Sequence, residues 1–298
     1  MRDFNNHQTT FRKIAESYEG FIVDLFGVLH DGVRPFPPAL DALRHLKSIK
    51  KRICLLSNSP RRAHQVASRL QSMKISAGIY DALITSGELV FDALENQEPA
   101  FVRGAGSRFF HIGPDELSGL LTGLAFVRVS DVSSADFVLA TGAPGRVADL
   151  AELKEAAARD LPLICANPDL SVLIGEREIA CAGVVALEYE TIGGRAYRFG
   201  KPSLPAYERA LKMMKLPPNR VLAIGDSVAT DIKGANQANI TSALVLSGIH
   251  HGYLRSRHGF NSSAFEQLCQ KHGACPSFVF SSLGLKEVAV HAGFANPP

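Results

Sequence analysis

The chain has 298 residues, 46% of them hydrophobic, enough for one large or two ordinary domains with packed cores. Lys and Arg number 32 and Asp and Glu 29, and the net charge of +3 is too small to indicate a nucleic acid or a membrane as the main partner. The five cysteines are odd in number, widely spread and mostly in apolar runs, which is typical of reduced core thiols. We expect a cytoplasmic protein, because the amino terminus lacks the apolar segment of a secretory signal and no run of about eighteen apolar residues could span a bilayer.

Strand-like and helix-like patterns alternate along the first part of the chain. The apolar residues before Asp24 form a short run that breaks at Gly27, as expected of a strand buried on both faces. Two more runs of this kind follow, and a helical pattern comes after each of the three. This alternation predicts consecutive βαβ units on a parallel sheet. The strands are expected within FIVD (21–24), RICLLS (52–57) and the start of DALITSGELVFDALEN (81–96), and the helices within PPALDALRHLKSIK (37–50), RRAHQVASRLQSM (61–73) and the rest of 81–96.

The middle of the chain, residues 88–194, keeps α/β character but reads as a unit of its own. The alternation of strand-like and helix-like patterns seen in the first part of the chain returns after it, which suggests a core interrupted by an insertion. In the insertion we predict strands at 126–130, 136–140 and 161–167 and a helix at 146–159. After it we predict helices at 204–215, 230–238 and 263–273 and strands at 220–227, 241–248 and 277–282.

Three of the predicted strands end on polar side chains. Asp24 ends the first strand, Ser57 and Asn58 end the second, and Asp226 ends a later one, with Asp231 five residues further on. The carboxyl ends of parallel strands meet at one edge of a sheet, where ligands bind, so we expect these side chains to lie together. Carboxylates gathered in this way repel one another unless a cation is present, and ligands that are all oxygen suit Mg²⁺.

A lysine completes the set, because the segment FGKP places Lys201 in a turn before a helix. Together these residues describe a site for phosphoryl transfer. Mg²⁺ and Lys201 would neutralise the phosphate, while Ser57 and nearby backbone N–H groups would hold its oxygens. Asp24 would then attack the phosphorus in line.

The segments DLFGVLHDG, LLSNSP, GKPS and GDSVATDIKGA, in this order, resemble the four motifs of the haloacid dehalogenase superfamily, in particular its class IIA phosphatases. The segment ANPD at 166–169 is similar to a cap segment of that class. The resemblance implies an α/β fold with a Rossmann-like, doubly wound parallel sheet as its core, residues 1–87 and 195–298, and an inserted α/β cap domain, residues 88–194. It also implies Mg²⁺ as cofactor, an aspartyl-phosphate intermediate and, because caps of this class often contribute to dimer contacts, a homodimer.

The resemblance assigns roles to individual residues. Asp24 becomes the nucleophile, Ser57 the phosphate-binding hydroxyl and Lys201 the charge-stabilising lysine. The implied metal ligands are Asp24, the backbone carbonyl of Phe26, and Asp226, with Asp231 reached through water. The implied contacts with substrate are Asn58, Asn167 and Asp169.

One position departs from the family pattern. Most phosphatases of the superfamily read Asp-x-Asp, and the second Asp protonates the leaving oxygen; here that residue is Phe26. Its backbone carbonyl remains, but general acid–base catalysis, typically a factor of about 10²–10⁴, is lost. A substrate with an acidic leaving group, such as an aryl or acyl phosphate, could still react. His30 in the adjoining loop and Asp169 in the cap segment are two hypotheses for a replacement acid.

Each of these residues also has an ordinary structural interpretation. An Asp at a strand end usually caps a turn, Ser57 and Asn58 could cap the next helix, and Lys201 could be a solvated surface residue. We expect a Mg²⁺-dependent phosphatase for a small phosphorylated metabolite, since an enclosing cap disfavours macromolecules. Two alternatives stay open: a catalytically weak protein that binds a phosphorylated ligand, and a phosphotransferase.

Overall fold

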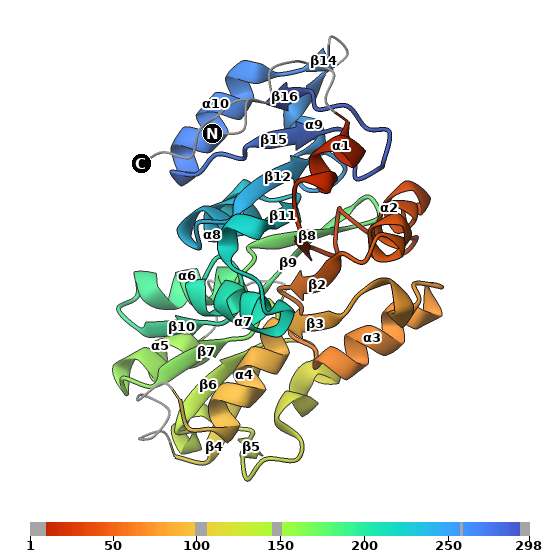
Figure 1. Cartoon of the computed structure of the whole chain (residues 1–298). Coiled ribbons are helices and arrows are strands. Elements are labelled where there is room, and N and C mark those ends of the chain that lie inside the picture. The colour runs from red at the N-terminus through yellow and green to blue at the C-terminus, as the bar shows by residue number, and fades with distance from the viewer. Residues whose placement is uncertain (1–9, 99–105, 145–150, 257–258, 293–298) are drawn as a thin grey trace.

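Two parallel sheets with flanking helices make up the part of the chain that the computed structural model describes, residues 10–98, 106–144, 151–256 and 259–292 (Figure 1). The larger sheet has seven strands in the order β16-β15-β12-β11-β1-β2-β3, and the smaller has five in the order β10-β7-β6-β4-β5. From β1 the chain builds the larger sheet outward first on one side, through β2 and β3, and later on the other. This arrangement confirms the predicted α/β fold with a doubly wound parallel sheet.

The larger sheet consists of β1 (Gly20–Val23), β2 (Arg52–Ser57), β3 (Ala82–Thr85), β11 (Val221–Gly225), β12 (Thr241–Val245), β15 (Phe278–Phe280) and the antiparallel edge strand β16 (His291–Ala292). Its associated helices are α1 (Phe11–Glu16), α2 (Pro37–Ser48), α3 (Ala63–Ser72), α4 (Ser86–Glu95), α7 (Leu204–Met214), α8 (Lys233–Gln237), α9 (His251–Leu254) and α10 (Ser262–His272). A short antiparallel pair, β13 (Arg255–Ser256) and β14 (Gly259–Phe260), follows α9.

The smaller sheet consists of β4 (Arg108–Ile112), β5 (Val127–Val129), β6 (Phe137–Ala140), β7 (Pro162–Cys165) and β10 (Arg195–Arg198), with helices α5 (Ala151–Ala158) and α6 (Ala182–Thr191). A separate hairpin is formed by β8 (Ser171–Ile174) and β9 (Arg177–Ala180). Short 3₁₀ segments cover Ala77–Ile79, Asp115–Leu121, Val132–Ser134 and Pro218–Arg220, and a π-helical turn covers Val228–Ile232. The smaller sheet lies on the side of β3 and α4 (Figure 1).

Strand β1 is buried on both faces because its alternate side chains enter two different cores. Phe21 belongs to the core under α2, which also contains Leu43, while Ile22 belongs to the core under α7, which also contains Tyr207. Successive side chains of a strand point to opposite faces, so an uninterrupted apolar run is what a sheet covered on both sides requires. The predicted strand before Asp24 is therefore confirmed.

The segment from β4 to β10 contains more strands than the sequence predicts. The three predicted strands of this region are found as β5, β6 and β7, whereas β4, β8, β9 and β10 were not expected. The predicted helix at 146–159 is present as α5 from Ala151, and its first residues lie outside the described ones. Because β10 pairs with β7, the smaller sheet continues to Arg198. The division into a core, 1–87 and 195–298, and a cap, 88–194, stays a prediction.

Two expectations from composition can be compared with the structure. All five cysteines are free, and four of them are buried, as expected of core thiols. The sulfur atoms of Cys269 and Cys275 lie 2.6 Å apart at the end of α10. In the described part of the chain, no helix combines the length and the apolar character needed to cross a bilayer.

Candidate active site

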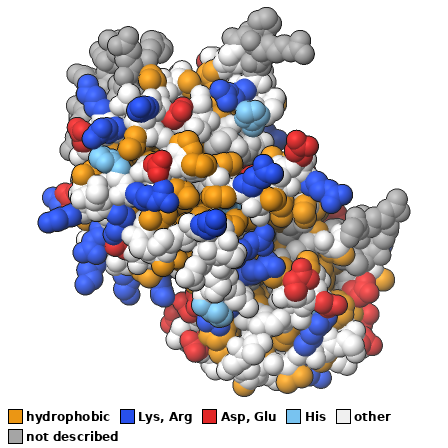
Figure 2. All heavy atoms as spheres, turned by 90° about the vertical axis from the view of Figure 1, so that its right-hand side faces the viewer, with side chains coloured by type: hydrophobic (Ala, Val, Ile, Leu, Met, Phe, Trp, Pro, Cys, Tyr) orange, Lys and Arg blue, Asp and Glu red, His pale blue; other side chains and the backbone are white. Residues whose placement is uncertain are grey.

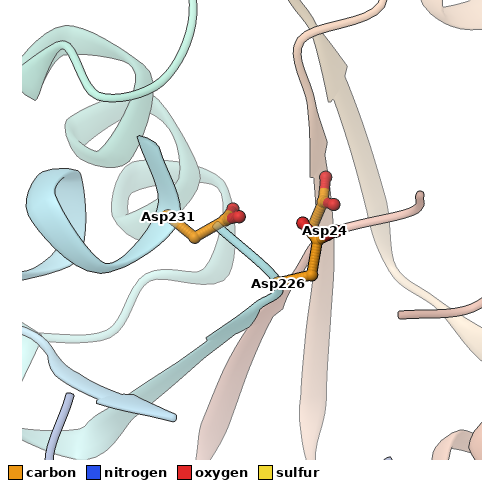
Figure 3. A group of neighbouring side chains, drawn as sticks. All are labelled: Asp24, Asp226 and Asp231. Atoms are coloured by element: carbon orange, nitrogen blue, oxygen red, sulfur yellow. The ribbon is translucent and has the colours of Figure 1, made fainter. Parts of the chain in front are cut away.

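Three carboxylates meet at the carboxyl edge of the larger sheet. Asp24 follows β1, Asp226 follows the adjacent strand β11, and Asp231 lies in the π-helical turn after β11. The backbone N–H of Asp24 donates to the carbonyl of Ile224 over 2.9 Å, so pairing between the two strands continues up to the first carboxylate. One oxygen from each carboxylate lies within 4.8 Å of the others, and Figure 3 shows the side chains turned toward the same space.

Glycines allow these carboxylates to approach the backbone. A Cβ atom on Gly248 would lie 1.8 Å from Oδ2 of Asp226, and one on Gly225 would lie 2.0 Å from Cγ of Asp231. Gly27 would clash with Asp226 in the same way and also has a φ of +71°, which favours glycine. Backbone N–H groups then fix the acids: Ile249 donates to Asp226 over 2.8 Å and Ser227 donates to Asp231 over 3.1 Å.

Lys201 is buried among these acids. It is 3% exposed, and its Nζ lies 2.5 Å from Oδ1 of Asp24 and 2.7 Å from Oδ1 of Asp231. Burial alone would lower the pKa of Lys201, but Asp231 and Asp24 raise it well above its usual range. One ammonium faces three carboxylates, so the cluster carries an excess of negative charge when all are ionised. A divalent cation would offset that excess.

The same charges perturb the carboxyl groups. Burial raises the pKa of Asp24 to about 7, although Lys201 acts in the opposite direction. Burial, followed by the charge of Asp24, raises the pKa of Asp226 well above its usual range. Both groups therefore hold protons more tightly than exposed carboxylates do. A cation bound between them would favour their ionised forms.

Asn58 links the two sheets at this site. Its Oδ1 accepts from the backbone N–H of Lys201 over 2.7 Å, and its Nδ2 donates to the Lys201 carbonyl over 3.0 Å and to Oδ1 of Asp169 over 2.8 Å. Asn167 supports the contact, because its Oδ1 accepts from the backbone N–H of Asp169 over 3.2 Å. The residues predicted from two distant motifs and from the cap segment are thus brought together. Burial raises the pKa of Asp169 to about 6.

Ser57 is buried and lines the same cavity as Asp24. Its Oγ accepts from the backbone N–H of Ser59 over 3.2 Å and so stabilises the turn after β2, whereas the cap of the next helix, which was the ordinary structural interpretation of Ser57, is Arg62. The hydroxyl keeps its own proton for donation. It could therefore stabilise the turn and donate to a phosphate oxygen at once.

Phe26 and His30 form an aromatic pair beside Asp24, with ring centroids 4.6 Å apart in an edge-on arrangement. Nδ1 of His30 accepts from the backbone N–H of Gly32 over 2.9 Å, so the ring proton of the neutral form lies on Nε2. Burial lowers the pKa of His30 to about 4, which keeps the imidazole neutral near pH 7. A neutral imidazole is not a general acid, so these contacts favour a structural role for His30 and leave Asp169 as the better hypothesis.

A cavity of about 790 Å³ lies over the cluster, within the range of small-molecule sites. Part of its wall comes from the β8–β9 hairpin, which the sequence did not predict. The backbone N–H of Gly175, at the tip of the hairpin, donates to the carbonyl of Asp31 over 2.9 Å. The hairpin therefore reaches the loop that follows the proposed nucleophile. Arg61 and Arg69 also line the cavity and were not singled out in the sequence.

Comparisons with known proteins identify the family of the chain. A family model described as haloacid dehalogenase-like hydrolase matches residues 21–126, and one described as HAD-hydrolase-like matches residues 198–277. Ribonucleotide monophosphatase NagD of Escherichia coli is 29% identical over 235 residues, which cover 76% of this chain and 87% of that protein. A structure of glycerol phosphate phosphatase from Mycobacterium tuberculosis with magnesium shares the fold, at 22% identity, a TM-score of 0.65, and coverage of 93% of this chain and 81% of that one.

This chain is 31% identical in sequence to a hydrolase of the haloacid dehalogenase-like family from Brucella suis that has a crystal structure. The match covers 86% of this chain and 95% of that one, with a TM-score of 0.75. Identity and coverage at this level, together with the two family models and the shared fold, confirm the resemblance seen in the motifs: the chain belongs to the haloacid dehalogenase-like family of hydrolases.

Proposed function

We propose that this hydrolase is a Mg²⁺-dependent phosphatase that acts on a small phosphorylated metabolite. The observation that carries the proposal is the cluster of three carboxylates around the buried amine of Lys201, at the base of a cavity of small-molecule size. The names of two relatives, a ribonucleotide monophosphatase and a glycerol phosphate phosphatase, support the same activity.

The donor set fits a magnesium ion. All three side chains offer oxygen, and their excess negative charge calls for a cation. In our proposal Asp24, Asp226 and the backbone carbonyl of Phe26 would hold the ion, and Asp231 would contribute through water. When bound, the ion supplies neutralising charge to the carboxylates and to the phosphate.

The protein groups then divide the remaining work. Asp24 attacks the phosphorus atom, a bond forms between its carboxylate oxygen and phosphorus, and the bond from phosphorus to the ester oxygen breaks. The ammonium of Lys201, 2.5 Å from Asp24, offsets charge on the transferred group, and the hydroxyl of Ser57 donates to one of its oxygens. Water then hydrolyses the aspartyl phosphate and releases inorganic phosphate.

The proton for the leaving oxygen needs a source other than Phe26. We assign it to Asp169, which Asn58 holds beside Lys201 and whose pKa of about 6 leaves part of the population protonated near neutral pH. Substrates with acidic leaving groups, such as aryl phosphates, depend less on this proton. The proposed substrate range is therefore widest below pH 6 and narrows above it.

Phosphate release from 4-nitrophenyl phosphate and from alkyl phosphates, with and without Mg²⁺, tests the proposal. We expect the wild type to hydrolyse the aryl ester only with Mg²⁺, and Asp24→Asn to be inactive. Phe26→Asp should raise the rate on alkyl esters by about 10²–10⁴, the usual value of a general acid. Asp41→Asn, on the exposed face of α2, serves as the matched control and should behave as wild type.

Two results would replace the proposal with its alternatives. If the wild type binds Mg²⁺ and phosphate but hydrolyses no ester, the protein is the catalytically weak binding protein. That alternative stays open because Phe26 stands where most of the superfamily has Asp. Accumulation of phosphorylated Asp24 without release of phosphate would identify a phosphotransferase, which passes the group to an acceptor other than water.

A further inference from the structure

Arg61, like Arg69 and unlike Arg62 and Arg198, forms no ion pair with any of the described residues. It is half-buried, lines the cavity and follows Ser57 by four residues. Its neighbour Arg62 pairs with Glu88 through two hydrogen bonds of 2.8 and 2.9 Å, and Arg198 pairs with Glu190. For the guanidinium of Arg61, no carboxylate of the described residues comes within 4.0 Å.

Arg69, on α3, is a second cation that lines the cavity and acts electrostatically on Arg61. One of its nitrogens donates to the backbone carbonyl of Gly32 over 3.2 Å, which is a neutral acceptor. Burial, followed by the charge of Arg69, lowers the pKa of Arg61, while the charge of Glu116, which also lines the cavity, acts in the opposite direction. Two cations that repel each other, one of them half-removed from water, would be stabilised further by an anion that binds both.

The walls near these arginines are apolar. Figure 2 shows the face of the molecule that carries α3, where basic side chains lie among hydrophobic ones. The apolar side chains that line the cavity from α3 and from the segments next to it and in the β8–β9 hairpin are Val66, Leu70, Met73, Ile174 and Ile179. A ligand in this cavity therefore meets carboxylates and Lys201 at the sheet edge, apolar walls along its body, and the two arginines beside α3.

We infer that Arg61 and Arg69 bind a second anionic group of the substrate, so that this enzyme selects phosphate esters with an apolar body and another anion. A carboxylate or a second phosphate would both match the planar guanidinium, which presents two parallel N–H donors to either group. This inference rests on the proposed phosphatase activity. It adds a specificity determinant that none of the four family motifs contains.

A matched pair of substrates isolates the second anion. 4-Carboxyphenyl phosphate and 4-carbamoylphenyl phosphate have nearly the same shape, but only the first carries the extra charge. The carbamoyl group withdraws electrons more strongly, so leaving-group chemistry alone favours the amide. The quantity to measure is the ratio of kcat/KM for the carboxylate to kcat/KM for the amide, at fixed pH and Mg²⁺ concentration. A comparison of kcat/KM for 1,4-phenylene bisphosphate with kcat/KM for 4-carboxyphenyl phosphate shows whether the preferred second anion is a phosphate or a carboxylate.

We expect this ratio to fall at least about fivefold in Arg61→Gln and in Arg69→Gln, mainly through KM, because a charge-assisted contact is lost. Arg61→Lys keeps the positive charge but loses the two parallel N–H donors, so its ratio should lie between those of wild type and Arg61→Gln. Arg44→Gln provides the control: Arg44 is exposed on α2 and pairs with Asp41, so its replacement should leave both rates unchanged.

The outcomes separate this inference from the proposed function. If Asp24→Asn abolishes hydrolysis of both esters while the ratio is the same in wild type, Arg61→Gln and Arg69→Gln, the phosphatase stands and the second anion site is overturned. If neither ester is hydrolysed, calorimetric binding of the same two esters with Mg²⁺ decides. Binding that favours the carboxylate in wild type but not in Arg61→Gln supports the site, and equal binding overturns it.

Discussion

Replacement of Lys201 by Met should cost stability in a way that depends on pH. Its ammonium lies 2.5 and 2.7 Å from two buried carboxylates, so without it one carboxyl group has to take up a proton for the protein to fold. An ordinary Asp has a pKa of about 3.9, and each pKa unit corresponds to about 1.4 kcal/mol. The penalty relative to wild type is therefore about 4 kcal/mol at pH 7 and about 1.5 kcal/mol at pH 5.

The sign follows from proton binding. Above pH 4 the folded variant holds one proton more than the folded wild type, while the two unfolded chains hold the same number, so the free energy of unfolding of the variant falls relative to wild type as the pH rises. Urea unfolding followed by circular dichroism, with EDTA present, measures both values. Lys212→Met, an exposed position on α7, is the control and should cost less than 1 kcal/mol at either pH. A Lys201→Met penalty that is the same at pH 5 and pH 7 would refute the reasoning.

Two further predictions concern Asp169 and Asp24, whose pKa values are raised. If Asp169 donates the proton, kcat/KM for alkyl phosphates should fall as the pH rises through about 6. Asp169→Asn should remove this pH dependence and lower kcat/KM for alkyl phosphates about 10²-fold, with a smaller loss for 4-nitrophenyl phosphate. A pH profile that is the same in Asp169→Asn and in wild type would exclude this role. Because burial raises the pKa of Asp24 to about 7, protons should compete with Mg²⁺, and calorimetry should show an affinity that weakens up to about tenfold per pH unit below 7. An affinity that is constant from pH 8 to pH 6 would contradict this.

Two of the three carboxylates of the site, Asp24 and Asp226, were predictable because they follow strands that are buried on both faces. The apolar run before Asp24 and the one before Asp226 are unmistakable in the sequence, and adjacent parallel strands bring their carboxyl ends to one edge. The contact between Asn58 and Asp169 was not predictable in this way. It joins residues 111 positions apart, and only the packing of one sheet against the other places them 2.8 Å from each other.

Two other features were not predicted from the sequence, for different reasons. The β8–β9 hairpin does carry a signal, the apolar run Val172–Ile174 followed by Gly175, but the strand was missed, and the structure leaves none of its residues fully buried. Arg61 and Arg62 are adjacent and identical in type, yet Arg62 pairs with Glu88 while Arg61 faces the cavity. Which arginine is free for a ligand depends on the position of Glu88 on α4, and the sequence alone does not give that position.

The replacement at Phe26 moves the source of the proton from one part of the molecule to another. In the usual family pattern the acid lies two residues after the nucleophile, on the same loop. In our proposal the acid is Asp169, in the segment between β7 and β8, and the hydrogen bond with Asn58 holds it at the site. Protonation of an alkyl leaving group then requires that contact, whereas attack by Asp24 on an aryl ester does not. Asn58→Ala should therefore widen the difference in rate between aryl and alkyl phosphates, even though Asn58 itself transfers no proton.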